Sequence, residues 1–197
     1  MEALQAILTR RSTRNYQPDP VEPEKLDRIL EAARQAPSGG NSQTNHFLVI
    51  RSRKVIANLI RVTEAAFARM DVTEDTYASL KHAIVMSKKG GYVFCYNAPV
   101  LIVVANRRDY GNNLADTACA IENMMIAANA LDLGSCWINQ LRWLNEEPAL
   151  LEYLCSLGMK ENERVYGAVI LGYPATESGL PNRNLMAQKG NEVTYID

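Results

Sequence analysis

A continuous apolar run at residues 99–105 constrains the fold more than any other feature of this sequence. The run reads PVLIVVA, and its branched aliphatic residues suit the pleated surface of a β-strand. Because the run has no polar position, both faces of the strand are expected to be covered, as in the middle of a layered protein. The run therefore predicts a central strand with structure packed on each side.

The rest of the chain alternates between helical and extended patterns. Helical periodicity predicts helices over residues 2–9, 24–35, 54–70, 74–87, 114–131 and 146–156. Short apolar runs predict further strands over 46–51, 134–140 and 164–171. Strands separated by helices indicate an α/β or α+β layered domain. The helix over 114–131 is apolar on most sides, which favours a place in the core or at a subunit interface.

The chain length and the polar carboxyl end together predict the domain organisation. The 197 residues, 47% of them apolar, suffice for one domain with a sizeable core, spanning residues 1–197. Residues 172–197 are polar and are expected to form an extended arm. The alternating pattern at 192–196 predicts one more short strand, which could pair with another subunit.

Charge and hydropathy exclude several classes of partner. The formal net charge of −1 and the lack of a basic run argue against nucleic acid as a partner. No apolar stretch approaches the roughly 20 residues that cross a bilayer, so no membrane partner is expected. The first residues lack the pattern of a secretory signal peptide, and we expect a cytoplasmic protein.

The cysteines and histidines predict neither a disulfide framework nor a metal site. No C-x-x-C pair occurs, and all four cysteines lie among apolar residues, which predicts small buried hydrophobic side chains in a reducing compartment. They are Cys95, Cys119, Cys136 and Cys155. The two histidines, His46 and His82, are far apart and adjoin no cysteine. No metal site is predicted.

Two polar clusters are candidate binding segments. Residues 10–16, RRSTRNY, place three guanidiniums and two hydroxyls within five positions, and such donors match phosphate oxygens. A solvated basic helix end is the alternative. Residues 37–45, PSGGNSQTN, could contact a flat heterocycle or could form an ordinary surface turn. The contacts would come from Ser38, Asn41, Ser42 and Gln43. Fingerprints of dinucleotide-binding, nucleotide-triphosphate and α/β-hydrolase sites are absent from the sequence.

Five motifs in order resemble the FMN-dependent nitroreductase family. Residues 10–16 are similar to its R-R-S-x-R-x-[FY] opening, and residues 36–43, APSGGNSQ, are similar to its A-P-S-x-x-N-x-Q loop. NAPVLI at 97–102 matches its central strand. Residues 127–138 resemble its helix-to-strand passage, and GYP at 172–174 resembles the segment before its carboxyl-terminal arm. The similarity extends over nearly the whole chain.

The resemblance implies a fold, an assembly and a cofactor. The fold is α+β with three α/β/α layers, a mixed central sheet flanked by helices, and an arm exchanged between the two subunits of a homodimer. Each FMN would lie at the subunit interface. Arg10 and Ser12 would bind its phosphate, Arg14 its pyrimidine edge, and Arg183 would supply a second phosphate-binding cation. Arg11 would either assist or remain a surface charge.

Further cofactor contacts are implied by the same motifs. One group would come from the partner subunit: Pro37, Ser38, Gly39, Asn41 and Gln43. A second group would line the flavin ring near N5: Trp137, Ile138, Asn139 and Gln140. The sequence departs from the family at 44–45, where Thr-Asn replaces the frequent Pro-Trp, and at 139–140, where Asn-Gln replaces Glu-Gly. At both places the ring contacts are expected to differ.

The resemblance implies an FMN-dependent oxidoreductase. NADH or NADPH would deliver hydride to flavin N5, and an electron-poor acceptor such as a nitroaromatic or a quinone would then take the electrons in a ping-pong cycle. No side chain is assigned a catalytic role. Other acceptors (an enone, a halogenated aromatic, flavin itself) remain open, as does a flavin-binding sensor or carrier without turnover. Specificity is expected in residues 62–96, whose candidates are Tyr77, Lys81, Met86, Tyr92, Phe94 and Tyr96, although core or surface packing is favoured for most of them.

Overall fold

The computed structural model describes residues 1–187 and 189–196. It contains four strands and seven α-helices within those residues, with one short 3₁₀ helix. In chain order these are α1 (Ala3–Thr9), α2 (Pro23–Arg34), η1 (Gly39–Asn41), β1 (His46–Ile50), α3 (Arg53–Ala68), α4 (Ala78–Lys89), β2 (Val100–Arg107), α5 (Asn113–Ala130), β3 (Gly134–Ile138), α6 (Gln140–Trp143), α7 (Pro148–Ser156) and β4 (Glu163–Gly172). The helices and strands predicted from the sequence match these bounds within a few residues.

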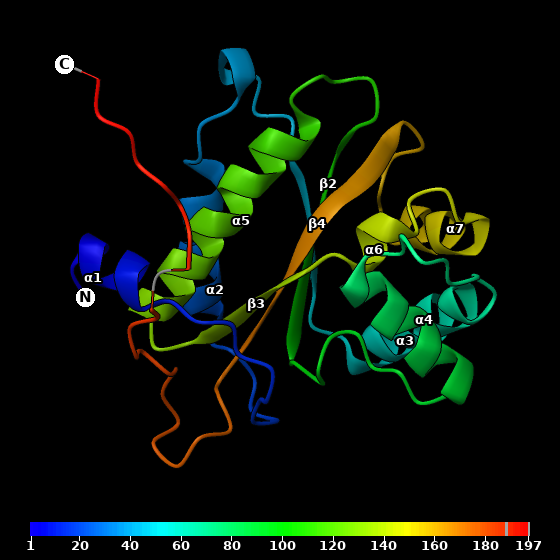
Figure 1. Cartoon of the computed structure of the whole chain (residues 1–197), viewed down its shortest axis with the longest axis horizontal. Coiled ribbons are helices and arrows are strands. Elements are labelled where there is room, and N and C mark those ends of the chain that lie inside the picture. Colours follow the sequence, from blue (N-terminus) through cyan, green and yellow to red (C-terminus); the bar gives the residue numbers. More distant parts are fainter. Residues whose placement is uncertain (188, 197) are drawn as a thin grey trace.

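The strands form one sheet between two layers of helices. Their order is β1-β2-β4-β3, and all three neighbouring pairs are antiparallel. Helices α1, α2 and α5 lie on one side of the sheet, and α3, α4, α6 and α7 lie on the other (Figure 1). The α+β class with three layers is thus confirmed. Among the described residues, parallel pairing occurs as a single bridge between Ser12 and Ser135 at the edge of β3.

Strand β2 is the covered central strand that its sequence predicts. Leu101, Val103 and Ala105 pack into a core with α3, α4 and α7. Val100, Ile102 and Val104 share the opposite face and pack into the second core with α2 and α5. This alternation follows from the two-residue period of side chains along a strand. Continuous apolar sequence is needed because both faces are buried.

Helix α5 packs closely over the middle of the sheet. A Cβ atom built at Gly167 of β4 would lie 2.6 Å from Cδ1 of Ile121, so the helix can approach only because position 167 has no side chain. Ile121, Met124 and Ala128 of α5 are fully buried. The predicted burial of this helix is therefore confirmed for its sheet-facing side.

The segment between α1 and α2 runs beside the edge strand β3 and the end of β4. Thr13 donates its backbone N–H to Ser135 O at 2.8 Å, and Tyr16 forms a bridge with Pro174. At Gly134 an added Cβ would meet the Thr13 side chain at 2.6 Å, which explains the glycine there. Backbone pairing thus places residues 10–16 next to β3.

Four sequence predictions are corrected by the structure. The strand expected over 134–140 ends at Ile138, and the chain turns into α6. Residues 192–196 form no strand within this chain. The sheet expected to be mixed is antiparallel in all three strand pairs. Cys119 is exposed on α5, whereas Cys95 and Cys136 are buried and Cys155 is half-buried.

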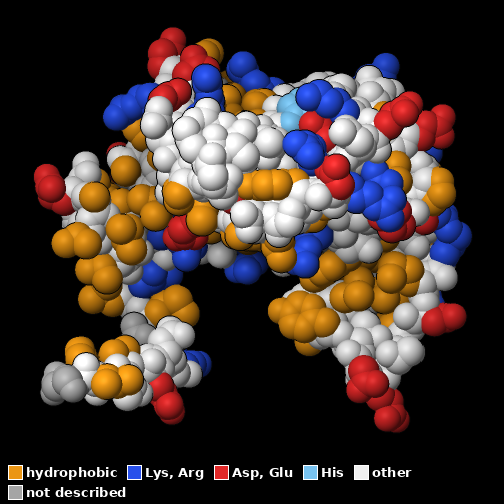
Figure 2. Space-filling model, turned by 90° about the horizontal axis from the view of Figure 1, so that it is seen from above, with side chains coloured by type: hydrophobic (Ala, Val, Ile, Leu, Met, Phe, Trp, Pro, Cys, Tyr) orange, Lys and Arg blue, Asp and Glu red, His pale blue; other side chains and the backbone are white. Residues whose placement is uncertain are grey.

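The part of the tail that the structure describes extends away from the body. The tail leaves the end of β4 and projects outward from the side that carries α1 (Figure 1). Figure 2 shows hydrophobic side chains gathered on this same side of the molecule. The exposed apolar residues of α1 and the tail are Leu4, Ile7, Leu8, Leu185, Met186, Val193, Tyr195 and Ile196.

Candidate functional site

The structure gathers one predicted group of site residues around a single cavity. A cavity of about 390 Å³ opens beside the carboxyl end of β3, and we call it the β3 cavity. Its lining consists of Arg14, Ala78, Ser79, His82, Tyr92, Tyr96, Cys136, Trp137, Ile138, Asn139, Gln140 and Trp143. Arg14 and the whole predicted stretch 137–140 thus share one cavity. Among the described residues, no Asp or Glu lines it.

Hydrogen bonds fix the polar side chains at the start of α6. Gln140 Nε2 donates to the Tyr92 hydroxyl at 2.9 Å, and Trp137 Nε1 donates to Asn139 Oδ1 at 2.9 Å. The side-chain oxygen of Asn139 therefore already accepts a hydrogen bond, and the side-chain N–H groups of Asn139 are the donors left for a ligand. The departure from Glu-Gly at 139–140 gives this wall neutral amides in place of a carboxylate.

Burial keeps the cavity's thiol and one of its phenols in their neutral forms. Desolvation raises the pKa of the Cys136 thiol, although the Arg14 charge acts in the opposite direction. Desolvation likewise raises the pKa of Tyr92. At neutral pH, Arg14 is the one permanently charged side chain among the described residues of the lining.

Arg10 and Arg183 are both anchored on α5. Arg10 Nε lies 3.2 Å from Glu122 Oε1. Arg183 donates to the backbone oxygen of Asn129 at 2.6 Å and to Asp132 Oδ1 at 2.6 Å. The Asn129 side chain in turn donates to Thr9 Oγ1 at 3.0 Å, directly before Arg10 in the chain. The structure therefore brings the distant Arg183 to the amino-terminal segment.

Arg11 points back toward α1. Its guanidinium donates to the backbone oxygen of Leu8 at 3.1 Å and to the backbone oxygen of Arg10. These acceptors belong to the end of α1, where helix carbonyls lack helical partners. These contacts hold Arg11 Nη1 at the end of its own helix.

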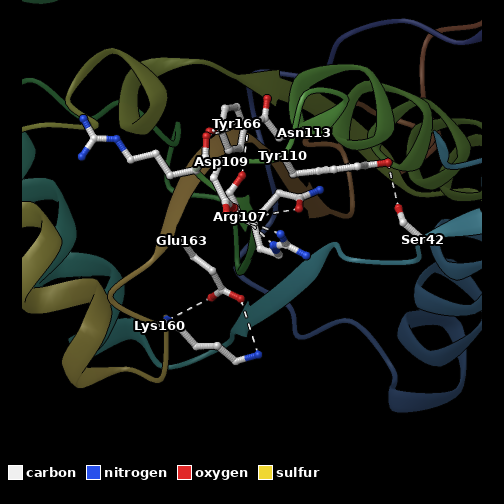
Figure 3. Close-up of polar contacts among 10 residues, drawn as sticks. Ser42, Arg107, Asp109, Tyr110, Asn113, Lys160, Glu163 and Tyr166 are labelled. Carbon is white, nitrogen blue, oxygen red and sulfur yellow. Dashed lines mark hydrogen bonds and ion pairs between the residues drawn. The ribbon is translucent and has the colours of Figure 1, made fainter. Parts of the chain in front are cut away.

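The loop after α2 is held by a buried carboxylate. Asp116 Oδ1 accepts from Gly39 N at 3.1 Å, and Asp116 Oδ2 accepts from the Tyr110 hydroxyl at 2.9 Å. The Tyr110 hydroxyl also lies 3.0 Å from Gly39 O and accepts from Ser42 Oγ at 2.8 Å (Figure 3). Asp116 is 5% exposed. This network fixes the backbone of the loop on the first turn of α5.

The loop presents its polar groups outward. Asn41 and Gln43 have left-handed backbone angles, with φ of 53° and 49°, and both side chains are exposed. Gln43 Nε2 donates to Asn41 Oδ1 at 2.8 Å. Ser38 and Gln43 border a second cavity of about 190 Å³. Pro37 is exposed at the start of the loop.

The loop and Arg183 are anchored near opposite ends of α5 within one chain, whereas Arg10 of the amino-terminal cluster reaches Glu122 near the middle of the helix. The loop is bonded to Asp116 near the start of this helix, whereas Arg183 is bonded to Asn129 near its end. Thirteen residues of helix separate these anchors, which corresponds to about 20 Å along the axis. None of the predicted residues 37–43 lines the β3 cavity.

The cavity also tests the candidates from residues 62–96. Tyr92 and Tyr96 line it, whereas Phe94 is buried in the core. The remaining candidates, Tyr77, Lys81 and Met86, are outside its lining. Sequence reasoning missed Cys136 of β3 as a lining residue. It also missed Ala78, Ser79, His82 and Trp143, which reach the cavity because α4 and α6 fold against each other. No local motif marks these four positions.

Neither histidine belongs to a metal-binding cluster in the described part of the chain. His46 Nδ1 lies 2.8 Å from Glu163 Oε2, and the buried Glu163 also accepts from Lys160 N at 2.9 Å (Figure 3). His82 packs edge-on against Tyr92, with ring centroids 6.2 Å apart. Residues 1–187 and 189–196 contain no group of three His, Cys, Asp or Glu side chains suited to a metal ion. No described helix is long and apolar enough to cross a membrane.

Comparison with known proteins identifies related chains over most of the sequence. The model of the nitroreductase family matches residues 7–173. A crystal structure of a nitroreductase with bound FMN from Bacteroides fragilis superimposes with a TM-score of 0.87 at 36% identity, covering 100% of both chains. A relative from Archaeoglobus fulgidus, provisionally named NADH dehydrogenase/NAD(P)H nitroreductase, is 31% identical over 176 residues, 89% of this chain and 87% of its own.

A third relative has a different name. The 5,6-dimethylbenzimidazole synthase of Rhodospirillum rubrum is 30% identical over 148 residues, which are 67% of this chain and 66% of its own. The family match, the nitroreductase from Bacteroides fragilis and the relative from Archaeoglobus fulgidus agree on an oxidoreductase. The chain belongs to the nitroreductase family of enzymes.

Proposed function

We propose that this chain binds FMN and transfers electrons from NADH or NADPH to an electron-poor organic acceptor. The observation that carries the proposal is the shared cavity of Arg14 and residues 137–140, which a resemblance in sequence alone could not place together. The Bacteroides fragilis nitroreductase, which superimposes over the whole chain, contains bound FMN and so supports the choice of cofactor.

The residues present fit this cofactor chemically. Arg10, Ser12 and Arg183 are the candidate ligands for a phosphate dianion, because guanidinium N–H groups match phosphate oxygens and a hydroxyl can donate to them. Arg14 has no carboxylate beside it in the described chain, so its charge is free for a ligand. Uncharged amides at 139–140 suit the polar edge of a flavin ring without repelling its reduced, negatively charged form.

Bound FMN would supply hydride chemistry at its N5 atom. The residues of this chain bind, orient and partly dehydrate the reacting ring. Trp137, Trp143 and Tyr92 give the cavity apolar walls, and Gln140 is held by the Tyr92 hydroxyl. The permanent charge of Arg14 favours an anionic ligand in that cavity. No side chain is assigned a catalytic proton transfer, and solvent supplies the protons.

We further propose that two copies of the chain complete each site. Support comes from the separation of about 20 Å along α5 between the anchors of the loop and of Arg183, and from the lining of the β3 cavity, which includes none of residues 37–43 of its own chain. Pro37, Ser38, Gly39, Asn41 and Gln43 would reach the cofactor of the second copy. The exposed apolar residues of α1 and the tail offer a surface for that contact, with the tail exchanged between subunits. Light scattering should give twice the 22.0 kDa mass of the chain.

The cofactor assignment is tested on the purified protein. A yellow preparation with flavin absorbance is expected, and anaerobic NADH or NADPH should bleach it. Colour should return on adding a quinone or a nitroaromatic, with parallel lines in double-reciprocal plots. A colourless protein that fails to bind micromolar FMN would refute the proposal. Flavin that is retained without turnover would instead identify a sensor or carrier.

The acceptor class requires a substrate panel. Relatives of about 30% identity have names that denote different reactions, so similarity does not select the acceptor. The panel compares nitroaromatics, quinones, enones, halogenated aromatics and free flavin against the same reduced protein. The acceptor with the highest kcat/KM defines the activity.

A further inference from the structure

Tyr96 forms one wall of the β3 cavity and has an unusual backbone conformation. Tyr96 and Asn97 are both left-handed, with φ of 52° and 57°. Residues other than glycine adopt such angles rarely, and mainly where the surrounding structure holds them. Here Ala98 N donates to Cys95 O at 3.0 Å, and Phe94 and Cys95 are buried below the turn. The turn therefore fixes the direction in which the Tyr96 side chain leaves the backbone.

The Tyr96 ring faces the guanidinium of Arg14. Arg14 Cζ lies 6.0 Å from the centroid of the ring, at the limit of a cation–π contact. Across residues 1–187 and 189–196, Arg14 takes part in no ion pair, in contrast to Arg10 with Glu122 and Arg183 with Asp132. A ring attracts a cation without cancelling its charge. The arginine is thus held by a neutral group.

We propose that Tyr96 is a positioning residue that keeps the Arg14 charge directed at the redox ligand. The inference rests on the proposed binding of FMN. A fixed cation stabilises the reduced, anionic form of the ligand more than the neutral oxidised form, because opposite charges at short range favour the charged state. Without the ring, Arg14 samples more rotamers and points into solvent for part of the time. Tyr96 therefore raises the reduction potential of the bound cofactor.

Two substitutions at position 96 separate the ring from the backbone. Tyr96→Asn removes the ring, and asparagine is among the residues that tolerate a left-handed φ best. Tyr96→Phe keeps the ring and removes only the hydroxyl. Tyr153→Asn is the control, because Tyr153 lies on α7 and outside the cavity lining. Each variant is loaded with FMN, and its midpoint potential and FMN dissociation constant are measured.

The expected result is a selective loss of affinity for reduced FMN. Tyr96→Asn should lower the ratio of reduced to oxidised FMN affinity by about two- to fivefold, the range of an exposed cation–π contact. For a two-electron couple this corresponds to a potential lower by roughly 10–20 mV. Tyr96→Phe and Tyr153→Asn should remain at the wild-type potential.

A double-mutant cycle with Arg14→Gln decides whether the effect acts through the arginine. In the Arg14→Gln background, Tyr96→Asn should cause no further shift. An equal shift with and without Arg14, or an unchanged potential in Tyr96→Asn, overturns the inference while leaving the proposed function intact. Failure of the wild-type chain to bind FMN would instead overturn both.

Discussion

The arginines of the amino-terminal segment differ in what holds them. Arg10 pairs with Glu122 on α5, Arg11 bonds to carbonyls of its own helix, and Arg14 lies against an aromatic ring. The sequence motif gives all three the same residue type, but these neighbours give them different capacities for a ligand. Arg10 and Arg14 keep donors available, whereas Arg11 Nη1 is already directed at backbone oxygens.

Replacing Arg10 with alanine should weaken FMN retention. The loss of a charge-assisted hydrogen bond corresponds to about 1.5–3 kcal/mol, or roughly a 10- to 150-fold higher dissociation constant. The ion pair with Glu122 is partly exposed, so the free energy of unfolding should change by less than about 1 kcal/mol. Fluorescence titration and urea unfolding measure the two effects. Arg61→Ala, an exposed site on α3, is the control, and equal affinities in both variants would contradict the phosphate assignment.

The buried thiol of Cys95 should make stability depend on alkaline pH. Desolvation raises the pKa of this thiol from 9.0 in the unfolded chain to about 11 in the folded protein. The contribution of the neutral Cys95 thiol to the free energy of unfolding is complete below pH 9. It is lost as the pH rises from 9 to 11, because in that range only the unfolded chain readily forms the thiolate. The loss should approach about 2–3 kcal/mol. Urea unfolding at pH 8 and pH 10.5 should show a smaller pH effect in Cys95→Ala than in Cys119→Ala, and equal effects would argue against this role of Cys95.

Among the elements, α5 organises the molecule. Its middle packs on β4 across Gly167, its first turn holds the loop through Asp116, and its last turn holds Arg183 through Asn129. One helix therefore sets the distance between the loop and Arg183. Substitutions in the first turn of α5 should therefore affect the contacts of the loop, and substitutions in its last turn should affect the contacts of Arg183.

The close contact between α5 and β4 predicts a specific rescue. Gly167→Ala places a Cβ within 2.6 Å of Ile121 Cδ1 in a closed core, and such overpacking costs about 1–3 kcal/mol of unfolding free energy. Ile121→Val removes that Cδ1 atom and should restore part of the loss when the two changes are combined. Chemical denaturation measures both. Additive destabilisation in the double variant would show that the contact is not the cause.

The network below the loop predicts a local effect. Tyr110→Phe removes the hydroxyl that bonds to Asp116, Gly39 and Ser42, which leaves a buried carboxylate with fewer donors. The expected cost is about 1–3 kcal/mol, with faster hydrogen exchange in residues 38–43. Tyr153→Phe on α7 is the matched control, since its hydroxyl forms no hydrogen bond within the described residues. Unchanged hydrogen exchange in residues 38–43 would show that Tyr110 does not support the loop.

For the molecule as a whole, the two-copy site predicts complementation. Arg14→Ala damages the β3 cavity, and a variant with Asn41→Ala and Gln43→Ala damages the loop. When equal amounts are unfolded together and refolded, half of the dimers are mixed, and each mixed dimer has one intact site. About a quarter of all sites should then recover FMN binding and NAD(P)H oxidation. Recovery no greater than the average of the two parents would mean that each chain forms its site alone.

Local sequence patterns were enough to predict the elements and the two polar clusters. A fully apolar strand and the helical periodicities around it are local signals, because side-chain spacing alone decides which face is buried. Residues 10–16 and 37–45 were likewise identified from consecutive positions, because each segment is rich in hydrogen-bond donors. Local patterns predicted a strand at 192–196, but this segment has no strand partner within the chain. They also predicted that Cys119 is buried because its sequence neighbours are apolar, but the Cys119 side chain is exposed to solvent.

Tertiary packing decided which of these segments contact one another. Contact between α4 and α6 brings His82, Tyr92 and Trp143 to the cavity of Arg14, and no spacing in the sequence encodes that contact. The length of α5 keeps the loop out of the same cavity, and the turn at Tyr96 sets a ring against the arginine. These distances between elements follow from side-chain packing across the sheet. Such packing depends on residues far apart in the chain, whereas each element forms from its neighbours alone.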